Sequence, residues 1–243
     1  NIISRVDKKY SYVDDVIVTN CNYGNSTPIM NATYHFSNIK IKDMMYKNKV
    51  PIVPGFFGKT FTGQITTMGR GGSDLTATIL GHCLESEDIS FYKVECDKQG
   101  NWKRGLVGIV HPDEKTITDL SFNEMHELGK YGRTVLHESS MLPIINDHYI
   151  KIYIKNTFEP DKEGTLIKNK VKREIILATI TTEKCNDDST YIHLIGDNIA
   201  HKISQGVFPY AIWNKNVHSA TILAKNNRCQ YIINNLLRKY SSN

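Results

Sequence analysis

The residues best placed to do chemistry lie in a glycine-rich loop at positions 69–74, GRGGSD. Neighbouring glycines allow several backbone N–H groups to converge on one ligand oxygen. A helix that begins near Ser73 would add unpaired N–H groups and the positive end of its dipole, and both favour a phosphate or a carboxylate. Arg70 could bind a carboxylate through two parallel hydrogen bonds. The loop predicts an anion site, although a tight turn with Ser73 as helix cap explains the glycines alone equally well.

The flanking sequence predicts the elements that would position this loop. Residues 50–54 (VPIVP) form a short apolar run, typical of a buried strand, that ends at Pro54 and Gly55. Residues 73–84 carry apolar side chains with helical spacing, which predicts an amphipathic helix directly after the loop. The order strand, glycine-rich loop, helix is a common architecture for binding an anion.

A longer set of motifs resembles the aspartate kinases of the amino-acid kinase family, in particular their plant-like monofunctional branch. The central match comprises VPIVPGFFG at 50–58, TTM at 66–68, GRGGSD at 69–74 and Thr76-Ala77. Further matching segments are IVT at 17–19, YGN at 23–25, LSFNEMHEL at 120–128, YGRTVLH at 131–137 and GTLI at 164–167. The resemblance covers residues 14–168.

The resemblance implies transfer of a phosphoryl group from ATP, bound with Mg²⁺, to L-aspartate, giving 4-phospho-L-aspartate. Arg70 would pair with the α-carboxylate of L-aspartate. The other implied substrate-binding residues are Phe56, Gly71, Gly72 and Ser73, and Asp74 is the implied catalytic residue, orienting the substrate amine or a phosphate-binding lysine. The structural alternatives are a surface arginine, a helix cap at Ser73 and a core phenylalanine.

The nucleotide side departs further from the family. The implied nucleotide-binding residues are Gly58, Lys93, Asp97 and Thr134. Thr134 stands where the family has a lysine, His111 stands where it has an acidic residue before proline, and residues 98–105 form an insertion. Loss of a preorganised cation weakens phosphoryl transfer, and Lys98, Lys103 or Arg104 could compensate for it.

Two functional hypotheses therefore stay open. In the first, the chain is an aspartate kinase whose Lys-Phe-Gly-Gly strand, which has no counterpart before Asp14, is supplied from outside these residues. In the second, it is a catalytically degenerate relative that acts as a regulatory, scaffold or complex subunit. A glutamate or uridylate kinase fits less well, because GRGGSD is typical of aspartate kinases.

Strands alternating with helices predict an α/β fold, a mainly parallel sheet covered by helices on both sides. We expect a kinase domain at 1–168 and a small α+β module at 174–243, joined at the basic segment 168–173. The module resembles a shortened ACT-type regulatory module, with strands at 174–182, 191–195 and 219–224 and helices at 203–213 and 229–240. Part of a hairpin near 216–219 is expected to be missing. Such modules pair across two-fold axes, which predicts a homodimer.

Composition limits the other classes of function. The 30 basic and 25 acidic residues give a net charge of +5 that is dispersed along the chain, which does not favour a nucleic-acid partner. The five cysteines include no Cys-x-x-Cys pair and the nine histidines have no ligand spacing, so no metal site of the protein's own is predicted. No apolar run predicts a membrane contact or a secretory signal. We expect a soluble intracellular protein, in cytoplasm or plastid.

Overall fold

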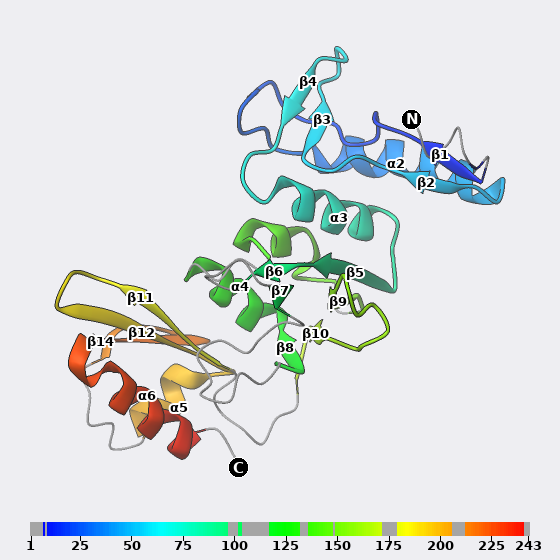
Figure 1. Cartoon of the computed structure of the whole chain (residues 1–243). Helices are drawn as coiled ribbons and strands as arrows, with labels where there is room; N and C mark the ends of the chain where they lie inside the picture. Colours follow the sequence, from blue (N-terminus) through cyan, green and yellow to red (C-terminus); the bar gives the residue numbers. More distant parts are fainter. Residues whose placement is uncertain are drawn as a thin grey trace. The chain divides into compact units, whose positions relative to one another are not determined.

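The computed structural model describes residues 7, 9–96, 102–103, 117–131, 136–147, 149–171, 179–205 and 212–240. Its contacts divide the chain into two compact units (Figure 1). Unit 1 comprises Asn1–Ile89 and Ser139–Ile150, and unit 2 comprises Ser90–Glu138 and Lys151–Asn243. This division differs from the predicted domains 1–168 and 174–243. That domain assignment stays a prediction, because part of its boundary lies outside the described residues.

Unit 1 carries the glycine-rich loop. Its strands β1 (Tyr10–Tyr12) and β2 (Val50–Ile52) are parallel, and β3 (Phe57–Lys59) and β4 (Ile65–Thr67) form an antiparallel hairpin. Helix α2 (Met30–Tyr46) packs against α3 (Gly72–Cys83), and the short helix η1 (Glu138–Ile144) follows later in the chain. The core of the unit is formed by Val13, Val16, Ile17, Ile41, Met68, Ile79 and Cys83. Met68 and Ile79 flank the loop, so this core fixes both of its ends.

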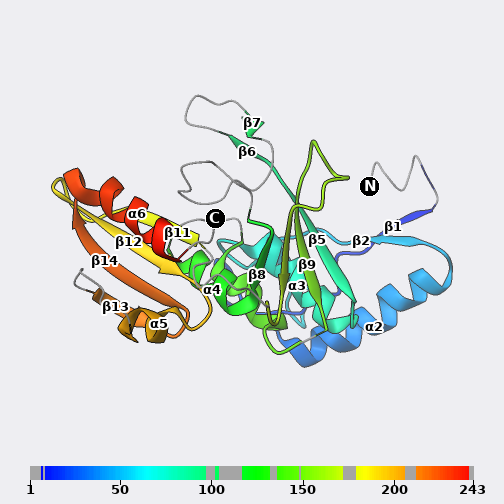
Figure 2. The same ribbon diagram turned by 90° about the horizontal axis from the view of Figure 1, so that it is seen from below.

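The first part of unit 2 is a sheet of four strands in the order β5 (Asp88–Lys93), β9 (Lys151–Asn156), β10 (Thr165–Lys168) and β8 (Asp119–Ser121) (Figure 2). The two-residue strands β6 (Glu95–Cys96) and β7 (Trp102–Lys103) pair separately. Helix α4 (Phe122–Lys130) begins directly after β8. Its capping box joins Ser121 Oγ to the Glu124 N–H at 3.2 Å and Glu124 Oε2 to the Ser121 N–H at 2.7 Å.

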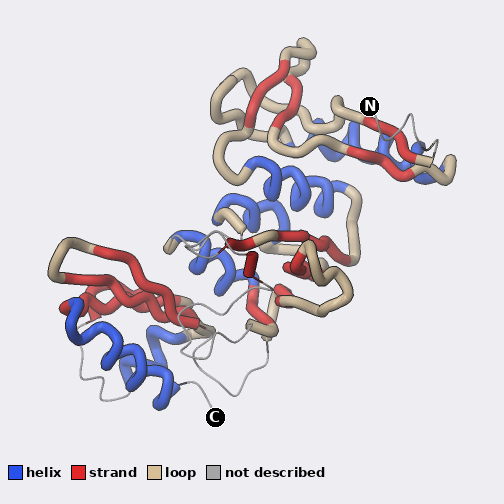
Figure 3. Tube along the Cα trace, viewed as in Figure 1, coloured by secondary structure: helices blue, strands red, loops and turns tan. Residues whose placement is uncertain are grey.

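The second part of unit 2 is an antiparallel sheet in the order β11 (Thr179–Lys184), β12 (Ser189–Ile195), β14 (Ser219–Lys225) and β13 (Ile212–Asn216). Helices α5 (Ile199–Gln205) and α6 (Asn226–Tyr240) lie along one face of this sheet (Figure 3). That face supplies Ile180, Ile192, Leu194, Ala220 and Ile222, and the helices supply Ile199, Ile203, Ile232, Ile233 and Leu236. Alternation along the strands therefore separates an apolar face from a polar one.

Most predicted elements are confirmed, and the C-terminal module needs two corrections. The α/β class is confirmed, with mixed pairing in the described sheets: β10 is parallel to β8 and antiparallel to β9. The helix predicted at 203–213 is wrong at its end, because residues 212 and 213 belong to β13, whereas 203–205 lie in α5 and 206–211 lie outside the described residues. The hairpin expected to be missing near 216–219 is present as the β13–β14 turn.

The polar face of the C-terminal sheet contains a buried histidine. His193 is 3% exposed, stands between Thr181 and Thr221 in register, and has its Nδ1 2.9 Å from Thr221 Oγ1. The Tyr131 ring, at the end of α4, stacks on it with centroids 3.9 Å apart. Its Nε2 has no hydrogen-bond partner in the described part of the chain and lies 3.5 Å from Glu183 Oε2. Burial lowers the pKa of His193, and Glu183 opposes that effect.

We expect the free energy of unfolding of unit 2 to decrease as the pH is lowered, because of this histidine. The folded state favours the neutral ring, so the unfolded state takes up the proton first, and the stabilisation present above about pH 6.5 is lost as the pH falls below that value. Urea unfolding of H193Q between pH 7.5 and 5.5 should show a flatter pH dependence than the wild type. The exposed His35 provides the control H35Q, which should keep the wild-type slope. Equal slopes for H193Q and the wild type would contradict this role.

Candidate substrate-binding loop

The glycine-rich loop joins β4 to α3 within unit 1. The β3–β4 hairpin brings Phe56 back to the loop, where the Met68 N–H donates to the Phe56 carbonyl at 2.9 Å. Gly69 and Gly71 have φ values of +72° and +79°, in the left-handed region that favours glycine. Gly71 is the N-cap of α3, and no side chain caps this helix. The interpretation of Ser73 as a helix cap is therefore wrong, because the helix begins one residue before it.

Polar side chains of neighbouring segments bind strand β4, which leads directly into the loop. The Ser26 N–H and Oγ donate to the Thr67 carbonyl at 2.8 and 3.0 Å, and Thr19 Oγ1 lies 2.5 Å from Thr66 Oγ1. A Cβ at Gly58 would lie 2.7 Å from the Ile17 carbonyl oxygen. Gly58, predicted to bind nucleotide, thus has a packing role as well, because any side chain there would collide with backbone.

Gly69 should tolerate alanine poorly. Its positive φ is costly for alanine, and a Cβ there would lie 2.7 Å from Asn25 Oδ1. We expect G69A to lower the free energy of unfolding by about 1–2 kcal/mol. Two controls separate the causes: G63A meets only the φ penalty, and G24A meets neither, since no atom lies within 4 Å of a Cβ at Gly63 or Gly24. Urea unfolding should rank the losses Gly69, Gly63, Gly24, and a G69A variant as stable as G24A would refute this account.

The predicted substrate-binding residues cluster around the start of α3. Arg70 and Ser73 are exposed, and Asp74 lies half-buried in the first helical turn, where its charge also complements the helix dipole. Gly71 and Gly72 provide the backbone between them. A Cβ at Gly72 would lie 3.1 Å from Phe56 Cδ2, so the Phe56 ring borders the helix N-terminus. Phe56 is 42% exposed, which does not fit the alternative of a core phenylalanine.

Arg70 differs from nearby basic residues in its electrostatic surroundings. Lys59 Nζ lies 2.8 Å from Asp14 Oδ1, and Lys40 pairs with Asp15. These hydrogen bonds raise the pKa of Lys59 and lower the pKa of Asp15. In the described part of unit 1, by contrast, Arg70 has neither an ion pair nor a hydrogen bond. Its guanidinium is thus available for a ligand carboxylate.

The structure describes less of the predicted nucleotide side. Lys93 ends β5 and belongs to unit 2, where its carbonyl accepts from the Thr157 N–H at 3.1 Å and Oγ1 at 3.2 Å. Its Nζ lies 5.7 Å from the Phe91 ring centroid. Asp97 and Thr134 lie outside the described residues. Within the described ranges, no group of three or more histidine, cysteine, aspartate or glutamate side chains could hold a metal ion.

Sequence reasoning missed Thr76 and Asn25. Thr76 Oγ1 accepts from the Phe56 N–H at 3.1 Å and donates to the Gly72 carbonyl at 2.8 Å. Thr76 belongs to the segment that resembles the aspartate kinases and is a polar residue on a largely apolar helix face, but neither feature predicts its bond to Phe56. Asn25 is adjacent to Gly69 because of the chain path, and no local pattern predicts that contact.

Comparisons with known proteins agree with the family suggested by the motifs. Residues 18–100 match the amino acid kinase family. Aspartokinase 2, chloroplastic, of Arabidopsis thaliana is 32% identical over 189 residues, which are 75% of this chain and 32% of the relative. The chain thus spans about a third of the length of this relative.

Two solved structures share the fold. Escherichia coli aspartokinase III in complex with lysine and aspartate has a TM-score of 0.76 at 16% identity, over 96% of this chain and 69% of that chain. The same enzyme in complex with aspartate and ADP has a TM-score of 0.72 at 16% identity, over 96% of this chain and 70% of that chain. These two structures support the fold. The family assignment comes from the sequence: residues 18–100 match the amino acid kinase family, and the motifs on both sides of the GRGGSD loop and the Arabidopsis relative are those of its aspartokinases.

Proposed function

We propose that the chain is an aspartate kinase, which transfers the γ-phosphoryl group of ATP to the side-chain carboxylate of L-aspartate. The observation that carries the proposal is the start of α3, where two left-handed glycines, an uncapped helix N-terminus and an arginine without an ionic partner in the described residues adjoin one another. All three features favour a carboxylate ligand. The aspartate-bound and ADP-bound states of the Escherichia coli enzyme support the choice of substrates.

In this proposal Arg70 and the backbone of Gly71 and Gly72 hold the α-carboxylate of L-aspartate. Ser73 donates to the same group, the Phe56 ring closes one side of the pocket, and Asp74 orients the amine. The side-chain carboxylate oxygen then forms a bond to the γ-phosphorus as the bond between that phosphorus and the β,γ-bridging oxygen breaks, releasing ADP. Positioning and charge neutralisation supply most of the catalysis in such a reaction.

The nucleotide would be bound by Gly58, Lys93, Asp97 and Thr134, with Mg²⁺ carried on its phosphates. Mg²⁺ usually binds through substrate phosphates and few carboxylates, so a binding site made of protein ligands alone is not required. We further propose that two copies of the chain pair through the C-terminal module.

The compartment, cytoplasm or plastid, stays an expectation. The Arabidopsis relative is described as chloroplastic. None of the helices in the described ranges has the length and apolar character needed to cross a bilayer.

Hydroxylamine trapping tests the proposal directly. An acyl phosphate reacts with hydroxylamine to give a coloured hydroxamate with ferric ion, so incubation with ATP, Mg²⁺ and L-aspartate should give hydroxamate in proportion to time and enzyme. L-glutamate in place of L-aspartate is the matched negative control. Binding of L-aspartate without hydroxamate would instead favour the alternative, a degenerate relative that acts as a regulatory, scaffold or complex subunit, for which the substitutions at His111 and Thr134 argue.

A further inference from the structure

Phe56 has an unusual backbone conformation beside the glycine-rich loop. Its φ is +81°, a region that bulky residues rarely adopt because Cβ crowds the backbone. Such a conformation persists only where the surroundings hold it, and strained residues of this kind concentrate at binding sites. The contacts that hold Phe56 therefore decide where its ring lies.

Within the described part of the chain, three contacts bear on the position of this residue. The Phe56 carbonyl accepts from the Met68 N–H at 2.9 Å, and the Phe56 ring lies against Gly72, where an added Cβ would come within 3.1 Å of Cδ2. The third contact is the hydrogen bond from the Phe56 N–H to Thr76 Oγ1 at 3.1 Å. It is the one of the three made by a side chain of α3.

Thr76 is buried, with 3% of its surface exposed, and its hydroxyl has two partners. It accepts from Phe56 and donates to the Gly72 carbonyl at 2.8 Å, the residue four positions earlier in the helix. A single hydroxyl thus joins the strained residue to the first residue of α3. The hydroxyl therefore links the Phe56 backbone to the N-terminal turn of α3.

We propose that Thr76 is a positioning residue for the substrate-binding loop: its hydroxyl holds Phe56 in the left-handed conformation that places the ring beside the N-terminus of α3. The inference rests on the proposed function, since that function gives the pocket its ligand. Because Thr76 is buried, its proposed role acts through Phe56 rather than through direct contact with the substrate. Without the hydroxyl, Phe56 relaxes to a negative φ, and the ring no longer borders Gly72.

The test compares T76V, which removes the hydroxyl at nearly constant volume, with T76S, which keeps it. The matched control is T78V. Thr78 is also buried in α3, and its hydroxyl lies 3.0 Å from the Leu75 carbonyl and 3.5 Å from the Asp74 carbonyl, with no hydrogen bond to Phe56 among the described residues. If T76V does not fold, T76A removes the same hydroxyl with less bulk.

The first readout needs no ligand. Amide hydrogen exchange at Phe56, followed by NMR, should become about tenfold faster or more in T76V, be close to wild type in T76S, and be unchanged in T78V. Unchanged exchange in T76V would show that the Thr76 hydroxyl does not hold the Phe56 backbone, whatever the protein binds.

The second readout is the dissociation constant for L-aspartate. We expect T76V to weaken binding about tenfold, T76S to restore most of it, and T78V to leave it unchanged, with the dissociation constant for Mg-ATP moving little in all three. Faster exchange with an unchanged affinity for L-aspartate would overturn the positioning role. Failure of the wild type to bind L-aspartate would instead refute the proposed function. The exchange measurement would still show whether the Thr76 hydroxyl holds the Phe56 backbone.

Discussion

Replacing Arg70 by alanine should weaken binding of L-aspartate by about 100-fold, because a charged donor pair to a carboxylate contributes roughly 2–3 kcal/mol. R70K should recover only part of this loss, since an ammonium group cannot reproduce the two parallel hydrogen bonds of a guanidinium. Because Arg70 has neither an ion pair nor a hydrogen bond within the described part of unit 1, its removal leaves no buried charge behind, and the thermal stability of the protein should change little. Isothermal titration with L-aspartate measures the loss directly.

The control for this experiment is R238A. Arg238 is an exposed arginine in the last turn of α6, so the variant changes the net charge by the same amount. Its affinity for L-aspartate should equal that of the wild type. Equal affinities of R70A and the wild type would remove Arg70 from the substrate site, and equal losses in R70A and R238A would point to a general charge effect.

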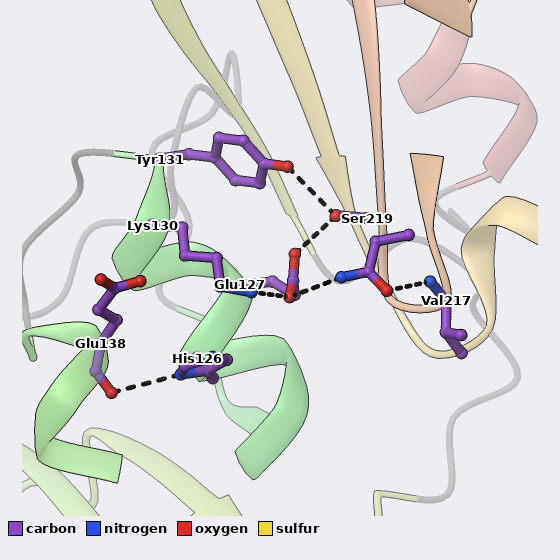
Figure 4. A network of polar contacts seen from close by, with 8 residues as sticks. His126, Glu127, Lys130, Tyr131, Glu138, Val217 and Ser219 are labelled. Carbon is purple, nitrogen blue, oxygen red and sulfur yellow. Dashed lines mark hydrogen bonds and ion pairs between the residues drawn. The ribbon is translucent and has the colours of Figure 1, made fainter. Parts of the chain in front are cut away.

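The largest effect on stability is expected at Glu127. This carboxylate is 4% exposed on α4 and accepts from Ser219 Oγ at 2.7 Å, Asn216 Nδ2 at 3.1 Å and Lys130 Nζ at 2.7 Å (Figure 4). Ser219 and Asn216 flank the β13–β14 turn, so one side chain connects α4 to the C-terminal sheet. We expect E127A to lower the free energy of unfolding of unit 2 by about 2–4 kcal/mol, because several donors lose their acceptor at once.

Two further variants distinguish the loss of the buried Glu127 hydrogen bonds from the loss of a carboxylate in general. E127Q keeps one acceptor oxygen and should cost less, roughly 1–2 kcal/mol. D187A removes a fully exposed carboxylate that pairs with Lys184 at 2.8 Å, and should be nearly neutral because exposed pairs contribute little. Urea unfolding followed by circular dichroism compares the three. An E127A variant as stable as D187A would contradict the connecting role of Glu127.

The same contacts explain why the compact units differ from the domains predicted from sequence. The change in composition near residue 168 indicates a boundary there. Yet α4 contacts the C-terminal sheet through polar groups, namely Glu127 with Ser219 and Tyr131 stacked on His193. A polar interface between segments so far apart in the chain leaves no hydrophobic periodicity, so sequence patterns do not predict it.

Elements with strong periodicity were predicted well. The helix predicted at 73–84 is α3, Gly72–Cys83, and the strand predicted at 219–224 is β14, Ser219–Lys225. The missed strands, β3, β4 and β8 among them, are three residues long and too short for alternation to be visible. β13 was missed because apolar residues before and within it also fit a helix.

The candidate site was predicted in part, and its geometry was not. The glycines at 69, 71 and 72 point to a turn and a helix start, and the structure has both. The left-handed conformation of Phe56 has no local sequence signal, because bulky residues rarely adopt it and tertiary contacts decide the exception. The hydrogen bond from the Phe56 N–H to Thr76 Oγ1 is one of those contacts, and it joins residues 20 positions apart in the chain.

The most direct test of the central claim is isothermal titration of the chain with L-aspartate, with R70A titrated in parallel. The account predicts saturable binding of one L-aspartate per chain by the wild type and a large loss of affinity in R70A. Absence of binding by a folded wild-type chain would contradict the claim that the glycine-rich loop at the start of α3 is an aspartate-binding site.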